Sequence, residues 1–132
     1  VVCIINLKSD GTPINCNFAS IGAINQAIVE PREIFKSAIL SNAAAMIMVH
    51  NHPSGNLEPS KEDTMITDRI LTLSAYMGIP LKDHVIVGGD NSSYFSFKEK
   101  ELLKMPKVSL TQNYHYLNFG QSAMVAERGK SR

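Results

Sequence analysis

The fold is decided by residues 43–63, which read AAAMIMVHNHPSGNLEPSKED. Residues 43–49 are all apolar and run directly into His50, a pattern typical of a strand that is buried on both faces. Pro53, Gly55 and Pro59 then interrupt any regular element and predict a loop. A helix is expected to begin at Ser60. The stretch therefore predicts a strand, a loop and a helix, with polar residues at both junctions.

The neighbouring segments extend this pattern into an α/β domain. Strands are expected at residues 1–7, 14–18, 84–88 and 94–97, and a helix at residues 32–42 behind Pro31. Asp10-Gly11 separates the first two strands and predicts a hairpin, because a two-residue hairpin turn needs positive φ. A further short helix is predicted at residues 98–104. The order strand–strand–helix–strand–helix–strand–strand predicts a mixed β-sheet with helices packed against it.

The helix predicted over residues 60–77 carries apolar residues at helical spacing. Gly78 and Pro80 follow it and provide a stop signal. The stripe expected to face the core consists of Met65, Ile66, Ile70, Leu73 and Met77.

Length and charge restrict the class of protein. A chain of 132 residues fits one domain, here expected to span residues 1–104, with residues 105–132 as a partly disordered C-terminal extension. The net charge of +1 gives no electrostatic basis for direct nucleic-acid binding or for attachment to an acidic membrane. No apolar run approaches the roughly 20 residues of a membrane-spanning helix. Cys3 and Cys16 are too few for a disulfide framework, so a cytoplasmic location is expected.

His50 and His52 form a His-x-His pair at the predicted end of a strand. Residues two apart on a strand point to the same side, roughly 6.5–7 Å apart at Cα, so two imidazoles can converge on one ion. Asp63 can supply a third ligand from the first turn of the next helix, because the loop has the length to bring that helix back beside the strand. Three protein ligands leave one tetrahedral position for water, as in catalytic zinc sites. One zinc ion per chain is therefore predicted, although the donor set also suits other divalent ions.

The Ser60-x-x-Asp63 part of the pattern has a second interpretation. A serine that is followed three residues later by an acidic residue is also typical of a helix N-cap, with a favourable negative charge in the first turn. The two interpretations are compatible, since a capped first turn is a rigid place for a ligand. His-x-His followed by Pro, Ser and Asp at these spacings arises by chance with a probability on the order of 10⁻⁵ for this composition. Competing signatures such as His-Glu-x-x-His and Cys-x-x-Cys are absent.

The pattern resembles the JAMM signature, in which His-x-His-Pro is followed after six residues by Ser-x-x-Asp. Four further segments are similar to the bacterial RadC-like branch of the JAB/MPN metalloprotease domains: residues 31–35, 42–45, 50–55 and 83–88. This resemblance implies a cytidine-deaminase-like α/β fold and zinc bound by His50, His52 and Asp63. It also implies that Ser60 stabilises the oxyanion formed at an attacked amide. Relatives cleave peptide or isopeptide bonds, whereas the RadC branch has been linked to DNA repair without a settled activity.

One feature departs from the family pattern. The general-base Glu of the family sits at the beginning of the first strand, which here falls at or before Val1, where no Glu stands. Glu30 and Glu33 lie near the start of a helix, where solvated acids are common. We therefore expect an N-terminally truncated fragment whose base lies upstream. His84 is interpreted as a structural residue or as a hydrogen-bond partner behind the site, with a fourth metal ligand as the alternative.

Two functions remain open from the sequence. The first is a zinc-dependent hydrolase of the JAMM type that cleaves an amide bond in a protein or peptide substrate through metal-activated water. The second is a non-catalytic, metal-bearing docking module of a protein associated with DNA repair or with a mobile element. A Glu shortly before the first strand would favour the enzyme.

Overall fold

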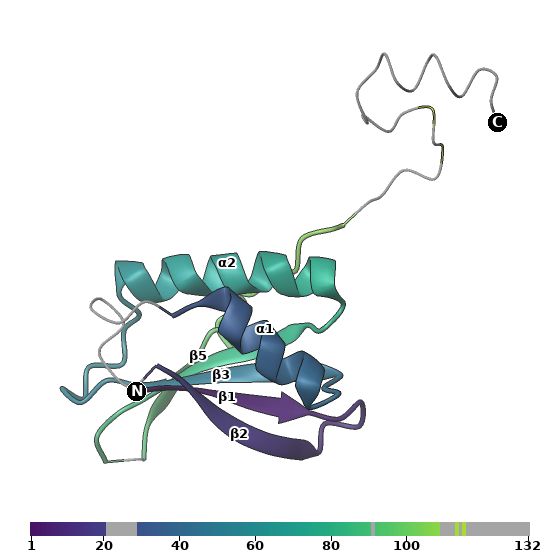
Figure 1. Ribbon diagram of the computed structural model, residues 1–132. Coiled ribbons are helices and arrows are strands. Elements are labelled where there is room, and N and C mark those ends of the chain that lie inside the picture. Colours follow the sequence, from purple (N-terminus) through teal and green to yellow (C-terminus); the bar gives the residue numbers. More distant parts are fainter. Residues whose placement is uncertain (21–28, 91, 109–112, 114, 116–132) are drawn as a thin grey trace.

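The computed structural model describes residues 1–20, 29–90, 92–108, 113 and 115 (Figure 1). Its elements follow the predicted order and confirm the α/β class. They are β1 (Val2–Leu7), β2 (Pro13–Ser20), α1 (Pro31–Leu40), β3 (Ala45–Asn51), α2 (Lys61–Met77), β4 (Leu81–Val87) and β5 (Tyr94–Ser96).

The five strands form one mixed sheet in the order β2-β1-β3-β4-β5. β1 is antiparallel to both β2 and β3, β3 and β4 are parallel, and β5 is antiparallel to β4. The hairpin between β1 and β2 turns at Gly11, whose φ of 89° is readily adopted by glycine. Helix α2 is the crossover between the two parallel strands.

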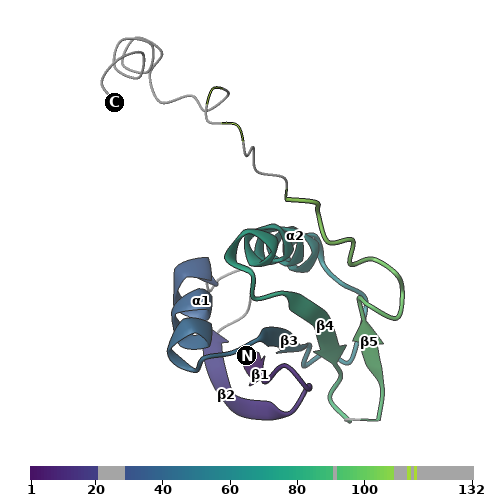
Figure 2. The same ribbon diagram turned by 90° about the vertical axis from the view of Figure 1, so that its right-hand side faces the viewer.

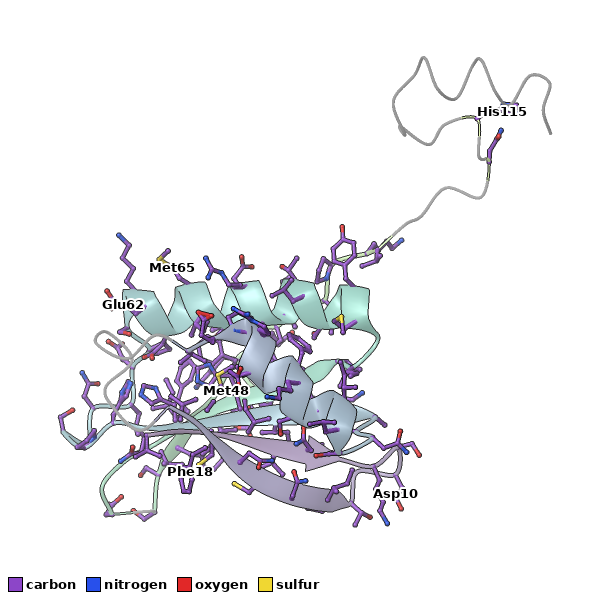
Figure 3. All side chains as sticks on the ribbon, viewed as in Figure 1. Asp10, Phe18, Met48, Glu62, Met65 and His115 are labelled. Carbon is purple, nitrogen blue, oxygen red and sulfur yellow. The ribbon has the colours of Figure 1, made fainter. Side chains whose placement is uncertain are left out.

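Both helices cover the same face of the sheet (Figure 2). The core lies between them and the sheet, and Figure 3 shows Met48 in this layer. Side chains alternate along β1 and β3, so that Val2, Ile4, Met46 and Met48 enter the core. The hydrophobic effect of this layer holds the sheet against the helices.

The prediction for the buried face of α2 was wrong at three positions. Met65, Leu73 and Met77 are exposed, and Figure 3 shows Met65 on the outer side of the helix. The residues that face the core are instead Asp63, Thr67, Ile70, Leu71 and Ser74. The Thr67 and Ser74 hydroxyls donate to backbone carbonyls and Asp63 Oδ2 accepts the Ser60 N–H, so helical position rather than hydropathy decides which side is buried.

The predicted helix at residues 98–104 is also not formed. Residues 97–101 make hydrogen-bonded turns, and Glu101 adopts a positive φ of 56° that cannot continue a helix. Asp83 accepts a hydrogen bond from the Lys98 N–H at 3.0 Å and ties this segment to β4. Among the described residues, no helix has the length and apolar character needed to cross a membrane.

Candidate metal centre

His50 and His52 come together at the carboxyl end of β3. His50 is the penultimate residue of the strand and is 5% exposed. His52 is the first residue after the strand and donates its backbone N–H to the Val87 carbonyl at 2.9 Å. The two rings contact edge to face with centroids 4.7 Å apart. The predicted convergence of the His-x-His pair therefore occurs in the structure, at the strand end where ligands commonly bind in α/β sheets.

Asp63 reaches the same point from the first turn of α2. Its side chain is buried, and Oδ2 accepts the Ser60 backbone N–H at 2.7 Å while Ser60 Oγ accepts the Asp63 N–H at 3.0 Å. This reciprocal pair is a capping box, which fixes the entry of the chain into the helix. The capping interpretation of Ser60-x-x-Asp63 is therefore confirmed, and the cap holds the Asp63 carboxylate beside the two histidines, where it could act as a metal ligand.

The three side chains bring donor atoms within 4.8 Å of one another. His50 Nδ1 lies 3.1 Å from Asp63 Oδ1, and His52 Nε2 lies 3.0 Å from Asp63 Oδ2. Tetrahedral zinc with bonds of about 2.1 Å separates its ligand atoms by about 3.4 Å. A small outward movement of the side chains thus makes room for an ion.

The hydrogen bonds of the site show that a cation fits it. Because the Asn56 carbonyl can only accept, the His52 Nδ1 that lies 2.7 Å from it must carry the proton. A neutral His52 ring then presents the Nε2 lone pair to a carboxylate oxygen, so two acceptors face each other. In addition, His50 Nδ1 and Asp63 Oδ1 are buried and make no hydrogen bond within the described residues. A metal ion between these atoms would satisfy all of them.

The electrostatics of Asp63 favour its ionised form. Burial alone raises the pKa of the Asp63 carboxyl. The adjacent His50 ring and the two hydrogen bonds with Ser60 act in the opposite direction and outweigh burial, so the pKa lies well below its ordinary value. The side chain is therefore a carboxylate at neutral pH, as a metal ligand must be.

Ser60 lies at the edge of the cluster as the exposed N-cap residue of α2. Its Oγ accepts the Asp63 N–H, which leaves the hydroxyl proton available for a second hydrogen bond. The structure thus places Ser60 next to the candidate metal ligands, while its role toward a substrate stays a prediction.

The other sequence candidates lie outside the cluster. No described acidic residue besides Asp63 joins it. Glu30 pairs with Arg32 at 3.8 Å, and Glu33 lines a surface hollow with residues of α1 and β2. His84 is fully buried but contributes no atom to the three-residue cluster. Its partner Thr67, and the Asn56 carbonyl behind His52, were not singled out by the sequence, because neither belongs to a metal-ligand pattern.

Comparisons with known proteins agree with this geometry. The chain is 44% identical over 100 residues to a UPF0758 protein of Clostridium novyi, covering 76% of this chain and 43% of that protein. It is 48% identical over 93 residues to a UPF0758 protein of Protochlamydia amoebophila, a match that covers 70% of this chain and 39% of that protein. The chain spans less than half the length of these curated relatives. The model of the RadC-like JAB domain matches residues 1–102, and the chain therefore belongs to the RadC-like JAB domain family.

Proposed function

We propose that this chain is the metal-binding part of a zinc-dependent hydrolase that cleaves a peptide or isopeptide bond. The observation that carries the proposal is the cluster of His50, His52 and Asp63, whose ligand atoms lie within 4.8 Å of one another and include buried atoms that have no hydrogen-bond partner in the part of the chain that the structure describes. Two imidazoles and one carboxylate form the ligand set of many hydrolytic zinc sites. Membership of the RadC-like JAB family supports the same assignment.

Each residue of the site has a distinct role in this proposal. His50, His52 and Asp63 hold the ion, which when bound would polarise an amide carbonyl and acidify water. Ser60 projects from the exposed first turn of α2 with a free hydroxyl proton, so it can donate a hydrogen bond to the developing oxyanion. The Asn56 carbonyl holds the His52 ring in the tautomer that leaves Nε2 as a ligand.

The general base is expected from a residue ahead of β1. Val2 pairs with His50 across the antiparallel β1–β3 ladder, so the beginning of β1 lies beside a metal ligand. The Val1 carbonyl accepts the Asn51 N–H at 3.3 Å, which extends this contact to the end of β3. A carboxylate contributed immediately before β1 would thus be close to the cluster. Loss of a general base typically lowers the rate of the catalysed reaction 10²- to 10⁴-fold.

The test compares residues 1–132 with a longer form of the protein that carries the upstream segment, at equal zinc content. Both are assayed on a panel of peptides and of isopeptide-linked ubiquitin-like substrates. We expect cleavage by the longer form, at least 100-fold less by residues 1–132, and none by the longer form with Asp63→Asn. The control variant Glu62→Gln removes an exposed acid from the same helical turn and should keep full activity. Cleavage that survives Asp63→Asn would contradict the proposal.

A second candidate function is a non-catalytic docking module that retains the metal. It is favoured by one observation, that Asp63 is the sole carboxylate in the cluster among the described residues. A longer form that binds one metal ion, contains no Glu ahead of β1 and cleaves none of the substrates would favour this candidate. A Glu at that position, whose change to Gln removes cleavage, would favour the enzyme.

A further inference from the structure

The wall behind the metal ligands contains a buried polar pair that the proposed reaction does not use. Thr67 lies one helical turn after Asp63 on α2, and its Oγ1 is 2.6 Å from the Asp63 backbone carbonyl. The same Oγ1 is 2.5 Å from Nδ1 of His84, which β4 brings against the helix. His84 is 0% exposed and Thr67 is 3% exposed. The contact therefore links β4 to the residue that supplies the carboxylate ligand.

The direction of these hydrogen bonds follows from the available protons. The Thr67 hydroxyl has one proton, and the Asp63 carbonyl can only accept. If Thr67 donates to this carbonyl, His84 Nδ1–H donates to Thr67 and all three groups are satisfied. The reverse assignment would leave Thr67 Oγ1 facing the carbonyl at 2.6 Å as a second acceptor. The chain Nδ1–H to Oγ1–H to O=C therefore requires the Nδ1–H tautomer of His84.

His84 is itself held in place from the β5 side. Its ring stacks on Phe97, with centroids 4.8 Å apart and planes 1° from parallel. Asp83 accepts hydrogen bonds from the Ser96 hydroxyl and from the Lys98 N–H, which fixes the segment that carries Phe97. The stacking and the burial of the ring hold its plane against Phe97, with Nδ1 directed at Thr67.

We propose that His84 and Thr67 are positioning residues of the metal centre. They fix the backbone of Asp63 from inside the fold, while the Ser60 N–H holds Oδ2 of the same residue from outside. Held at both points, the carboxylate keeps Oδ1 directed toward His50 before an ion binds. The inference rests on metal binding at the cluster and adds two residues that touch neither the ion nor the substrate.

The test uses paired variants that separate hydrogen bonding from packing. Thr67→Val keeps the shape and removes the hydroxyl, whereas Thr67→Ser keeps the hydroxyl. His84→Phe keeps a ring against Phe97 and removes the Nδ1–H donor. His84→Asn instead supplies a side-chain amide N–H close to the position of Nδ1. Co²⁺ titration followed by visible spectroscopy reports both affinity and coordination geometry. Removing such supporting partners weakens metal binding by about 10- to 100-fold.

We expect Thr67→Val and His84→Phe each to weaken Co²⁺ binding by about 10-fold or more and to alter the spectrum. Thr67→Ser and His84→Asn should recover most of the affinity. The double variant Thr67→Val/His84→Phe should lose less than the two single losses combined, because both act through one chain of hydrogen bonds. An imidazole ¹⁵N spectrum of the unsubstituted protein should show the His84 proton on Nδ1.

The outcomes distinguish this inference from the proposed function. Failure of the unsubstituted chain to bind Co²⁺ would overturn both the proposed function and the positioning role of His84 and Thr67. Normal binding with unchanged affinity and spectrum in folded Thr67→Val would overturn the positioning role alone. If His84→Phe does not fold, the Thr67 pair and the ¹⁵N spectrum still decide, and a His84 proton on Nε2 would contradict the assignment.

Discussion

The two helices of this domain are attached to the sheet in different ways. Helix α1 buries only apolar side chains, namely Ile34, Phe35 and Ala38, and its N-terminus has no side-chain cap. Helix α2 buries three polar residues alongside Ile70 and Leu71, and it is capped at both ends. Its N-terminus has the capping box, and its C-terminus ends on Gly78 with φ of 71°.

This difference separates stability from function. Helix α1 is held mainly by the hydrophobic effect, which is non-directional and tolerates small shifts, with a contact to β1 in which Ser37 Oγ accepts a hydrogen bond from Asn6 Nδ2 at 3.2 Å. Helix α2 is held at defined atoms of β4: Thr67 Oγ1 lies 2.5 Å from His84 Nδ1, and Ser74 Oγ accepts the Leu81 N–H at 3.1 Å. Hydrogen bonds fix direction, and a metal ligand needs a fixed direction. Substitutions in α1 should therefore lower stability, whereas substitutions along the buried face of α2 should impair metal binding.

The largest expected effect is that of Asp63→Asn on metal affinity. The amide oxygen of Asn can still accept the Ser60 N–H, so the stability cost should stay within about 1 kcal/mol. Loss of a charged ligand should weaken zinc binding by orders of magnitude, measured by calorimetric titration of the metal-free proteins. Glu62→Gln, in the same turn, should change neither quantity. Equal affinities in Asp63→Asn and the unsubstituted protein would leave Asp63 with a capping role only.

The opposite result is expected for Ile34→Ala in α1. Ile34 is 1% exposed, and truncation of a buried Ile costs about 2–5 kcal/mol of unfolding free energy. Urea denaturation measures this loss, and zinc affinity of the folded fraction should be unchanged. Ile39→Ala serves as the control, because Ile39 is 55% exposed. A specific loss of zinc affinity in Ile34→Ala would mean that α1 also orients the site.

An intermediate effect is expected from acidic pH on the metal-free protein. Burial lowers the pKa of His84 to about 4, from the ordinary histidine value of 6.5. As pH falls, His84 therefore takes up a proton in the unfolded chain before it does so in the folded protein. The free energy of unfolding then decreases between about pH 6.5 and pH 4. By pH 5 the loss amounts to about 2 kcal/mol. Urea denaturation at pH 7 and pH 5, with chelator present, should show a smaller loss in His84→Phe, and an identical loss would assign it to other groups.

The smallest effect on stability is expected at Ser60. Ser60→Ala removes the acceptor of the Asp63 N–H and should cost about 1 kcal/mol, whereas Ser60→Thr retains the hydroxyl and the cap. Under the proposed function, Ser60→Ala also lowers the cleavage rate of the longer form by roughly 10²-fold or more, and Ser60→Thr less. Thermal denaturation and the cleavage assay together separate the two roles. A stability loss without a change in rate would limit Ser60 to capping.

Local signals in the sequence were sufficient for the order of the elements up to β5 and for the convergence of His50, His52 and Asp63. The apolar run before His50 and the proline-rich loop after His52 determine how the strand ends and where the next helix begins. The ligand spacing then follows from strand and helix geometry. The capping interpretation of Ser60-x-x-Asp63 is confirmed, and it is compatible with metal binding because the cap leaves Asp63 Oδ1 directed toward His50.

Contacts between distant segments could not be predicted in the same way. Hydrophobic periodicity placed Met65 and Met77 toward the core, but Thr67 and Ser74 are buried instead, since each finds a hydrogen-bond partner at the α2–β4 contact. The role of Thr67 becomes visible only when β4 brings His84 against it. The segment after β5 forms turns because Asp83 binds the Lys98 N–H, a contact that no local pattern encodes.

The most direct test of the metal centre is elemental analysis of protein purified without chelator at neutral pH. We predict about one zinc ion per chain in the unsubstituted protein and almost none in His50→Ala/His52→Ala. His115→Ala, which changes a histidine outside the cluster, should retain the metal. Unchanged metal content in the His50→Ala/His52→Ala variant would contradict the assignment of the site to these residues.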